Sequence, residues 1–341
     1  GLSPRALGAN YTNTDYTFAE NSDMLDVWRL FVYARQRSRG SFDLSPLIDS
    51  RERRRIVGEE VVTISDIVCR RTYPDTIGRS QSNYDTHGYT VDPLFIVRAP
   101  HKSEMYAYTP YRALLPQRLD GLLVVGLGMS AHRDAMPILR MQPDLQNQGY
   151  AAGVAAAMAA ELDGRTRSID IRELQRHLVE VGNLPESVLS DEDSFPLPTD
   201  QIGEAVRTFH ENFKGAAVLL SHRSQALPLL REAYAAAIGE DKVTYALLLA
   251  VMGDATGGDA LIAAVEDQQT LDKGWNFRGM GQFGASMSRL DALILGLGLA
   301  GEKRAAPVII EKLKLLDASS EFSHHRAIAV ALEMLADRRA V

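Results

Sequence analysis

The chain changes character near residue 200. Before that point lie most of its tyrosines and several apolar segments of strand length, whereas after it alanine and leucine recur with a helical period. Between the two regions, residues 184–200 (LPESVLSDEDSFPLPTD) are rich in proline, serine and acidic side chains, as is typical of a linker. A length of 341 residues suffices for about two domains. We therefore expect an α/β region, a linker and an all-α region.

Charge and cysteine content exclude several classes of protein. The formal net charge is −7 and the isoelectric point is near 5.7, which argues against a nucleic-acid partner. A single cysteine, Cys69, rules out an internal disulfide and a cysteine-based zinc site. The longest apolar runs are shorter than the ~18 residues that a membrane-spanning helix needs, so we expect no membrane span.

Local patterns predict individual elements in the first region. Apolar side chains at helical spacing predict an amphipathic helix, and short continuous apolar runs predict buried strands. The predicted helices are Asp23–Gln36, one beginning with the cap signal Ser65-Asp66, Pro143–Leu162 and Asp170–Val181. The predicted strands are Leu94–Val97 and Leu122–Val125.

A glycine motif follows the second predicted strand. Residues 126–131 (GLGMSA) fit the G-x-G-x-x-A pattern of dinucleotide-binding folds. Pro137 interrupts the helix that such a fold needs next, and no acidic residue follows a second strand. We therefore reject the first βαβ unit of a dinucleotide domain and expect glycines that let the main chain approach a flat ligand closely.

The predicted helix from Pro143 has an unusually small surface. Gly149 and a series of alanines would let it pack tightly against a sheet or a cofactor. Its first N–H groups are unpaired, so its N-terminus favours an anion such as a phosphate or a reduced flavin. The alternative is that the small residues serve only close helix packing.

The region after residue 200 repeats weakly. Gly253-Asp254 and Gly301-Glu302 each precede an apolar helical segment, and the two pairs are 48 positions apart. A period of 40–50 residues is typical of stacked helical repeats, and these residues resemble HEAT repeats. A plain helical bundle is the alternative.

An ordered series of blocks resembles the FAD-dependent oxidoreductases related in fold to the fumarate reductase and succinate dehydrogenase flavoproteins. The similarity spans roughly residues 20–180. The blocks are residues 50–59 (SRERRRIVGE), Asp85-Thr86-His87, residues 110–116 (PYRALLP), residues 119–126 (LDGLLVVG), Ser130-Ala131, Asp134-Ala135, Arg140, Pro143, Gly149 and Ala151-Ala152-Gly153.

The resemblance implies a domain plan. Residues 1–50 would be a helical remnant of a substrate or cap region, and 51–183 the C-terminal part of a three-layer α/β FAD-binding fold. The linker 184–200 and a HEAT-like α-helical domain over 201–341 would follow. The family's N-terminal glycine-rich βαβ unit, which grips the ADP half of FAD, has no counterpart in this sequence. We therefore expect that unit to come from a further N-terminal segment or from a second chain.

The resemblance also implies FAD as cofactor and a small-molecule substrate. The residues expected to bind the cofactor are Arg112, Gly126, Gly128, Arg140, Pro143, Gly149 and Tyr150. The sequence departs from the family's pattern at Leu127, where an arginine is common, at Arg133, where a histidine is common, and at Tyr150, where a glutamine is common.

Residues for proton transfer and substrate binding lie in the same blocks. Asp85 and His87 would face the same side of an extended segment, where a carboxylate can orient an imidazole. A surface turn is the alternative for this pair. We expect His87, His132 and Arg133 to be catalytic.

Arginines and Asp85 complete the expected substrate site. A guanidinium binds a carboxylate through two parallel hydrogen bonds, so we expect Arg53, Arg54 and Asp85 to contact the substrate. No third ligand has the spacing of a metal site. The sequence thus favours an FAD-dependent oxidoreductase that transfers a hydride between an organic substrate and flavin. The alternative is a non-catalytic binding protein whose helical repeats bind a partner and whose incomplete flavin fold holds no FAD.

Overall fold

The computed structural model describes residues 24, 25, 28, 29, 32, 36, 55–86, 90–100, 104–275 and 287–336. Every described residue between 24 and 36 is helical, in agreement with the helix predicted over Asp23–Gln36. Arg53, Arg54 and His87 lie outside the described residues, so their predicted roles stay predictions.

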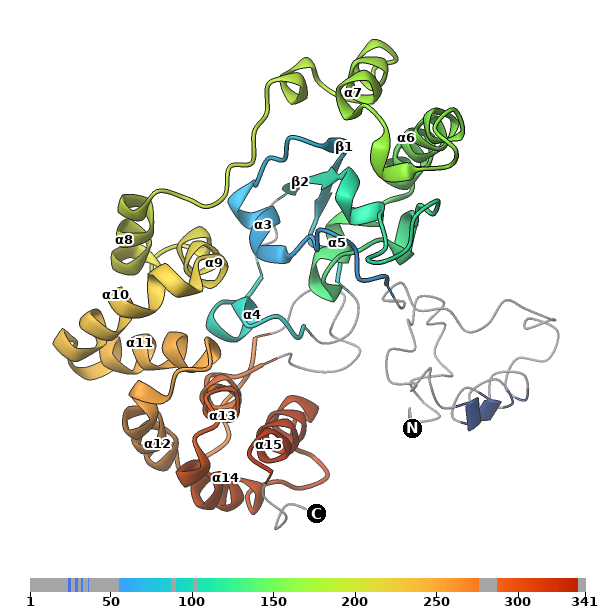
Figure 1. Cartoon of the computed structure of the whole chain (residues 1–341). Helices are drawn as coiled ribbons and strands as arrows, with labels where there is room; N and C mark the ends of the chain where they lie inside the picture. Colours follow the sequence, from blue (N-terminus) through green and yellow to red (C-terminus); the bar gives the residue numbers. More distant parts are fainter. Residues whose placement is uncertain are drawn as a thin grey trace.

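The first region combines short helices with a small sheet (Figure 1). Strands β1 and β2 pair antiparallel, with Ser80 opposite Ala107 and an irregularity between Thr76 and Gly78. In order, the helices and strands are α3 (Ile64–Cys69), β1 (Thr76–Asn83), α4 (Leu94–Val97), β2 (Glu104–Pro110), α5 (Met136–Leu139), α6 (Gln142–Ala160) and α7 (Ile171–Glu180). Among the described residues this pair is the whole sheet, so a three-layer fold stays a prediction.

Both predicted strands are wrong. Leu94–Val97 is helix α4, which follows Asp92-Pro93, a sequence that starts a helix because proline suits the first turn. Leu122–Val125 forms no strand with the described residues, among which Leu114 O accepts the N–H of Val124 at 2.9 Å. Short apolar runs do not distinguish a strand from a buried helix or an extended loop, which is why both predictions failed.

The helix expected at Ser65-Asp66 begins two residues earlier. Thr63 is the N-cap of α3, and its hydroxyl accepts a hydrogen bond from Asp66 N. Asp66 Oδ2 accepts a hydrogen bond from Thr63 N in turn, and the two bonds together form a capping box. Asp66 is thus the third residue of the helix and not its cap.

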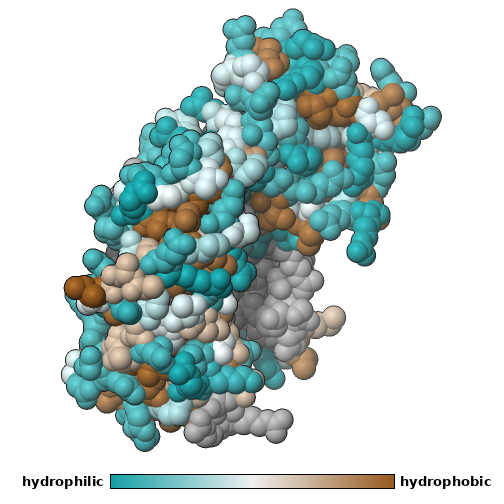
Figure 2. Space-filling model, turned by 60° about the vertical axis from the view of Figure 1, so that its left-hand side comes forward, coloured by the Kyte–Doolittle hydropathy of each residue, from teal (hydrophilic) through white to brown (hydrophobic). Residues whose placement is uncertain are grey.

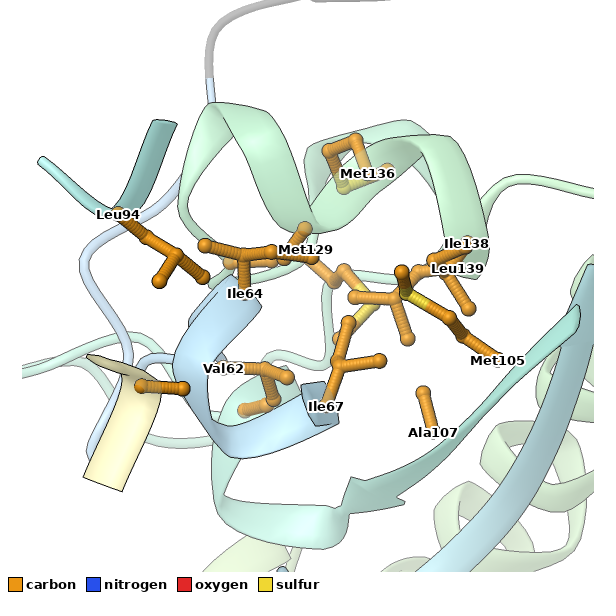
Figure 3. Close-up of a cluster of buried hydrophobic side chains, with 14 of the residues drawn as sticks. Val62, Ile64, Ile67, Leu94, Met105, Ala107, Met129, Met136, Ile138 and Leu139 are labelled. Carbon is orange, nitrogen blue, oxygen red and sulfur yellow. The ribbon is translucent and has the colours of Figure 1, made fainter. Parts of the chain in front are cut away.

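The core of the first region lies between α3, α5 and β2 (Figure 3). Helix α3 contributes Ile64 and Ile67, and β2 contributes Met105 and Ala107. The residues drawn and labelled around them are Val62, Leu94, Met129, Met136, Ile138 and Leu139, all buried. Met129 belongs to the glycine motif, so its burial in this core anchors the motif to the first region.

The predicted long helix and its neighbour are both present. Helix α6 covers Gln142–Ala160, close to the predicted Pro143–Leu162, and buries its alanine side. Helix α7 covers Ile171–Glu180, and the Asp170 carboxylate caps it by accepting from the backbone N–H groups of Arg172 and Glu173.

The second region is built from helices, and an isolated β-bridge pairs Trp275 with Met287 (Figure 1). Its helices are α8 (Thr199–Thr208), α9 (Phe213–Ser221), α10 (Arg223–Ala236), α11 (Gly239–Val251), α12 (Gly258–Asp267), α13 (Arg289–Leu299), α14 (Ala306–Leu313) and α15 (Phe322–Met334). The strongest packing is between α13 and α15, between α11 and α13, and between α10 and α11. This confirms the all-α region, whereas its HEAT-like nature stays a prediction.

Arg71 attaches the linker to the first region through Asp193. Arg71 bonds both oxygens of Asp193 at 2.9 Å, and its Nη1 lies 3.1 Å from Glu60 and from Asp66. Its guanidinium also lies 4.6 Å and 5.0 Å from the ring centres of Tyr73 and Phe195. We call Arg71 with these five partners the linker clamp.

Helix α4 joins the two regions. It packs against α9, α11 and α13, and the rings of Phe95 and Phe213 lie 6.2 Å apart. The buried core runs without interruption from Val62 to Met252. The first region therefore shares this core with the beginning of the helical region, whereas α12, α13, α14 and α15 pack around a separate core together with part of α11.

The surface seen in Figure 2 is mostly hydrophilic, with small hydrophobic groups separated by polar side chains. None of the described helices combines the length and apolar character needed to cross a membrane.

Candidate functional site

Gly126 presents an open stretch of main chain. Its φ of +69° favours glycine, because a Cβ is strained in that conformation. A Cβ built at this position would meet nothing within 4 Å. The motif is therefore not filled by the protein's own side chains at this residue.

A buried glutamine fixes the open loop to α6. Gln148 Oε1 accepts the N–H of Gly126 at 2.5 Å, and its Nε2 contacts the sulfur of Met129 at 3.1 Å. Gln148 is 3% exposed, so it holds the loop from inside. Sequence reasoning missed it, although a polar residue in line with the buried Ala151, Ala152 and Ala155 of α6 was a usable signal.

The second glycine of the motif, Gly128, and two glycines outside it, Gly149 and Gly58, differ in role. A Cβ at Gly128 would lie 3.1 Å from Val124, so that glycine serves internal packing. A Cβ at Gly149 would meet nothing within 4 Å. A Cβ at Gly58 would lie 2.7 Å from Ser130 Cβ, too close for a side chain, and the Gly58 N–H donates to Ser130 Oγ at 2.9 Å. The end of the arginine block is thereby attached to the glycine motif.

The start of α6 already carries a carboxylate. Pro143 is exposed in the first turn, and Met141 caps the helix without a side-chain bond. Asp144 in that turn has its pKa raised by burial, against hydrogen bonds from Gln81 N and Ser80. When ionised, this side chain is stabilised by the helix dipole, so it would compete with an anion bound at the same helix end.

Arg140 and Asp85 come together as an ion pair. Arg140 Nη2 donates to the backbone oxygen of Asp85 at 2.5 Å and to its Oδ2 at 3.0 Å. The Arg140 side chain is 5% exposed, and its Nε is buried with no hydrogen-bond partner. Thr86 Oγ1 and Thr90 Oγ1 are likewise buried and unbonded. The predicted cofactor and substrate residues therefore meet beside buried groups that still have hydrogen bonds to make.

His132, Arg133 and Asp134 form a second polar cluster. Asp134 is fully buried, and its Oδ2 accepts the N–H groups of Val91 and Asp92 at 2.7 Å and 2.6 Å. Its Oδ1 accepts Arg133 Nη1 at 2.7 Å. The predicted catalytic arginine thus balances the charge of this carboxylate.

An aspartate that sequence reasoning missed lies against His132. Asp92 Oδ2 is 3.4 Å from His132 Nδ1, and Asp92 Oδ1 accepts the N–H of Leu94 at 2.9 Å. Burial raises the pKa of the Asp92 carboxyl above its ordinary value. The signal was the Asp-Pro pair that starts α4, and it was overlooked because Leu94–Val97 was interpreted as a strand.

Arg112 already has two carboxylate partners. It bonds both oxygens of Asp75 at 3.1 Å, and its Nη1 lies 3.5 Å from Glu60. The hydrogen bonds to Asp75 raise the pKa of Arg112. Its predicted contact with the cofactor therefore competes with an ion pair that supports the first region.

Tyr150 interacts with α7. Its hydroxyl lies 2.8 Å from His177 Nε2, and the two rings stack with centres 5.9 Å apart. Tyr150 remains 44% exposed, so its predicted contact with the cofactor stays a prediction.

A cavity of about 300 Å³ lies elsewhere, between α4, α11 and α13. Its walls include Arg98, Trp275 and Arg289 and none of the predicted site residues. Within the described ranges, no group of three or more His, Cys, Asp or Glu side chains is placed to hold a metal ion.

Comparison with known proteins locates these features. Residues 15–178 match the model of the family described as FAD dependent oxidoreductase. No curated protein and no solved structure matches the chain. All of the predicted site residues fall inside the matched segment. The match supports an oxidoreductase function for this part of the chain, and FAD is the cofactor of the matched family.

Proposed function

We propose that residues 51–183 are the C-terminal part of an FAD-dependent oxidoreductase related to the fumarate reductase flavoproteins. Hydride would pass between an organic substrate and the flavin. The observation that carries this proposal is the open main chain at Gly126, fixed from beneath by Gln148. The linker 184–200 and the HEAT-like region 201–341 complete the proposed domain plan.

The residues around Gly126 and Gly149 would fit one edge of a flat cofactor. Gly126 and Gly149 leave the backbone uncovered, and nearby Gln148 keeps the loop rigid. FAD, when bound, supplies the ring that accepts or releases a hydride. The ADP half of FAD would be held by a further N-terminal segment or by a second chain.

Charge and protons would be handled by two groups of side chains. Arg140 offers a buried positive charge and an unbonded Nε beside Asp85. His132 is about one-third exposed, so it can exchange a proton with a substrate while Asp92 and Asp134 contact its Nδ1. His87, Arg53 and Arg54 remain proposed contributors from outside the described residues.

The proposal is tested with a matched pair of glycine variants. Gly126→Ala and Gly164→Ala each place a Cβ on a residue of positive φ, +69° and +78°, with nothing within 4 Å. Each should lose about 1–2 kcal/mol of stability for the same conformational reason. Only Gly126→Ala should also weaken FAD binding, by at least about tenfold, which is ~1.4 kcal/mol.

The measurement is quenching of flavin fluorescence during titration with protein, alongside thermal unfolding. Equal FAD affinity in both variants would remove Gly126 from the site. If the wild-type chain shows no FAD affinity even with the N-terminal FAD-binding unit of a related oxidoreductase added, the non-catalytic binding protein becomes the better description.

A further inference from the structure

The cavity of about 300 Å³ lies where the first region meets the helical region. Helix α4 belongs to the first region and packs there against α11 and α13 (Figure 1). Small-molecule sites occur preferentially at such junctions, and this volume is at the lower end of their usual range. No residue of the site described above lines the cavity, so any ligand here would be a different one from FAD or its substrate.

The walls of the cavity are mainly apolar. The apolar side chains come from α4, from one face of α11 and from the first turns of α13, and they are Ile96, Val97, Val243, Leu247, Ala292 and Leu293. Those from α4 and α11 are half-buried, which leaves apolar surface for a ligand to cover. Trp275 adds an indole ring, and its backbone N–H donates to Met287 O at 2.9 Å.

Arg98 brings a positive charge to these walls. Its Nη2 donates to the backbone oxygens of Phe209, at 3.2 Å, and of His210. Both partners are neutral carbonyl groups, and within the described part of the chain Arg98 has no carboxylate partner. Its Nε and Nη1 donate to none of these residues either, so they have hydrogen bonds left to make.

The other charged groups at the cavity already have partners. Arg289, the first residue of α13, pairs with Glu240 in the first turn of α11, and both side chains are exposed. The backbone N–H groups of Arg289 and Leu290 donate to Asp272 Oδ2 at 3.1 Å and 3.3 Å. The start of α13 is therefore occupied by a carboxylate of the protein, and Arg98 is the wall cation that lacks one.

We propose that this cavity binds a small organic anion with an apolar body, of the arylalkyl carboxylate class. The carboxylate would accept hydrogen bonds from Arg98, because a guanidinium binds an ionised acceptor more strongly than a neutral one. The apolar body would lie against Trp275 and the side chains of α4 and α11. This inference goes beyond the proposed function and needs no flavin.

The test uses three probes that differ in charge and share one apolar body. They are 3-phenylpropionate, the neutral 3-phenylpropanol and the cationic 3-phenylpropylamine. The chain has two tryptophans, so a Trp28→Phe background leaves Trp275 as the fluorescent reporter of the cavity. We expect saturable binding of the carboxylate, at least about tenfold tighter than that of the alcohol, and no binding of the amine.

Arg98→Gln is the decisive variant, because glutamine keeps a donor for the two carbonyls and removes the charge. It should bring the affinities for carboxylate and alcohol within about threefold of each other. Arg165→Gln is its matched control: Arg165 also donates to a backbone oxygen, that of Leu162 at 3.0 Å, and does not line the cavity. The control should bind all three probes as the Trp28→Phe background does.

Val243→Phe, which fills the cavity from the α11 side, should abolish carboxylate binding and keeps the proposal testable if Arg98→Gln does not fold. Equal affinity for carboxylate and alcohol in the Trp28→Phe background overturns the proposal, as does a fluorescence change that never saturates. Carboxylate binding that survives in Val243→Phe, or a preference for carboxylate that survives in Arg98→Gln, also overturns it. FAD affinity, measured separately, tests the proposed function and leaves this result untouched.

Discussion

The first region and the helical region solve the same problem of buried polar groups in different ways. In the first region the bonds reach far along the chain, as between Gly58 and Ser130 or between Arg71 and Asp193, 122 positions apart. In the helical region the buried carboxylates of Asp254 and Glu302 are bonded within a local turn that occurs twice, beside pairs distant in sequence such as His324 and Asp291. Contacts between residues distant in sequence cost more loop-closure entropy. They nevertheless bring together side chains that a local sequence pattern cannot place next to each other.

The repeated turn is the clearest feature of the helical region. Gly253 and Gly301, 48 positions apart, have φ of +71° and +67°. Asp254 then caps a short 3₁₀ turn through Thr256 N at 2.9 Å, as Glu302 does through Arg304 N at 3.1 Å. Helices α12 and α14 follow in turn. The repeat predicted from sequence and its assignment to HEAT repeats remain our proposal.

We expect the largest effect from a variant that removes the linker clamp. Arg71→Ala leaves Asp66 and Asp193 without their cation and Glu60 with Arg112 alone, so we expect a loss of about 3 kcal/mol in the free energy of unfolding. Limited proteolysis should then cut within residues 190–198 first. Chemical denaturation measures the loss of stability.

Arg207→Ala is the control for the clamp. Arg207 pairs with Glu204 on an exposed helix surface, where such pairs contribute under about 1 kcal/mol. If Arg71→Ala costs no more than this control, the linker is held by its apolar contacts and not by the clamp.

A second prediction concerns a buried pair in the helical region. His324 Nδ1 lies 2.7 Å from Asp291 Oδ1, with both side chains at most 3% exposed. The hydrogen bond to Asp291 raises the pKa of His324. The pair's contribution is therefore complete below the unfolded pKa of this histidine and is lost as the pH rises through its higher folded pKa.

We expect the wild type to lose about 2 kcal/mol of stability across that interval, since a hydrogen bond to a charged group contributes roughly this much. His324→Asn should lack this pH dependence, whereas His325→Asn, at the neighbouring and more accessible histidine, should keep it. Thermal unfolding over a pH series measures both, and parallel curves for the wild type and His324→Asn would contradict the assignment.

The smallest effect sharpens the comparison between the two turns. Gly253→Ala and Gly301→Ala should each cost about 1–2 kcal/mol, because both residues need a left-handed conformation. A Cβ at Gly301 meets nothing within 4 Å, and one at Gly253 would lie 3.3 Å from the flexible end of Arg223 and 3.8 Å from Leu299 O. The two losses should be equal within about 0.5 kcal/mol and should add in the double variant. Clearly unequal losses would show that the two turns are not equivalent.

Sequence reasoning succeeded where a local pattern was long. Helix α6, helix α7 and the all-α region were predicted because their apolar and small residues recur over several turns. It failed for Leu94–Val97 and Leu122–Val125, where four apolar residues are compatible with several structures. The error at Leu94–Val97 also hid Asp92, since a helix start would have marked that aspartate as a cap.

Among the site residues, the blocks were recognised but their contacts were not. Arg140 and Asp85 were assigned to cofactor and substrate separately, and the structure joins them. Arg112 was assigned to the cofactor, and the structure pairs it with Asp75. Neither partner choice could be read from the residues, since each pair bridges dozens of positions.

Residue order and composition alone were enough to predict that the second half of the chain is helical, because a helical period depends on neighbours along the chain, whereas the linker over residues 184–200 stays a prediction. Only the tertiary structure showed that Gln148 bonds to Gly126 and that Asp92 lies beside His132. Those contacts depend on how α4, α5 and α6 pack around one core, and side-chain packing in space leaves little trace in local spacing.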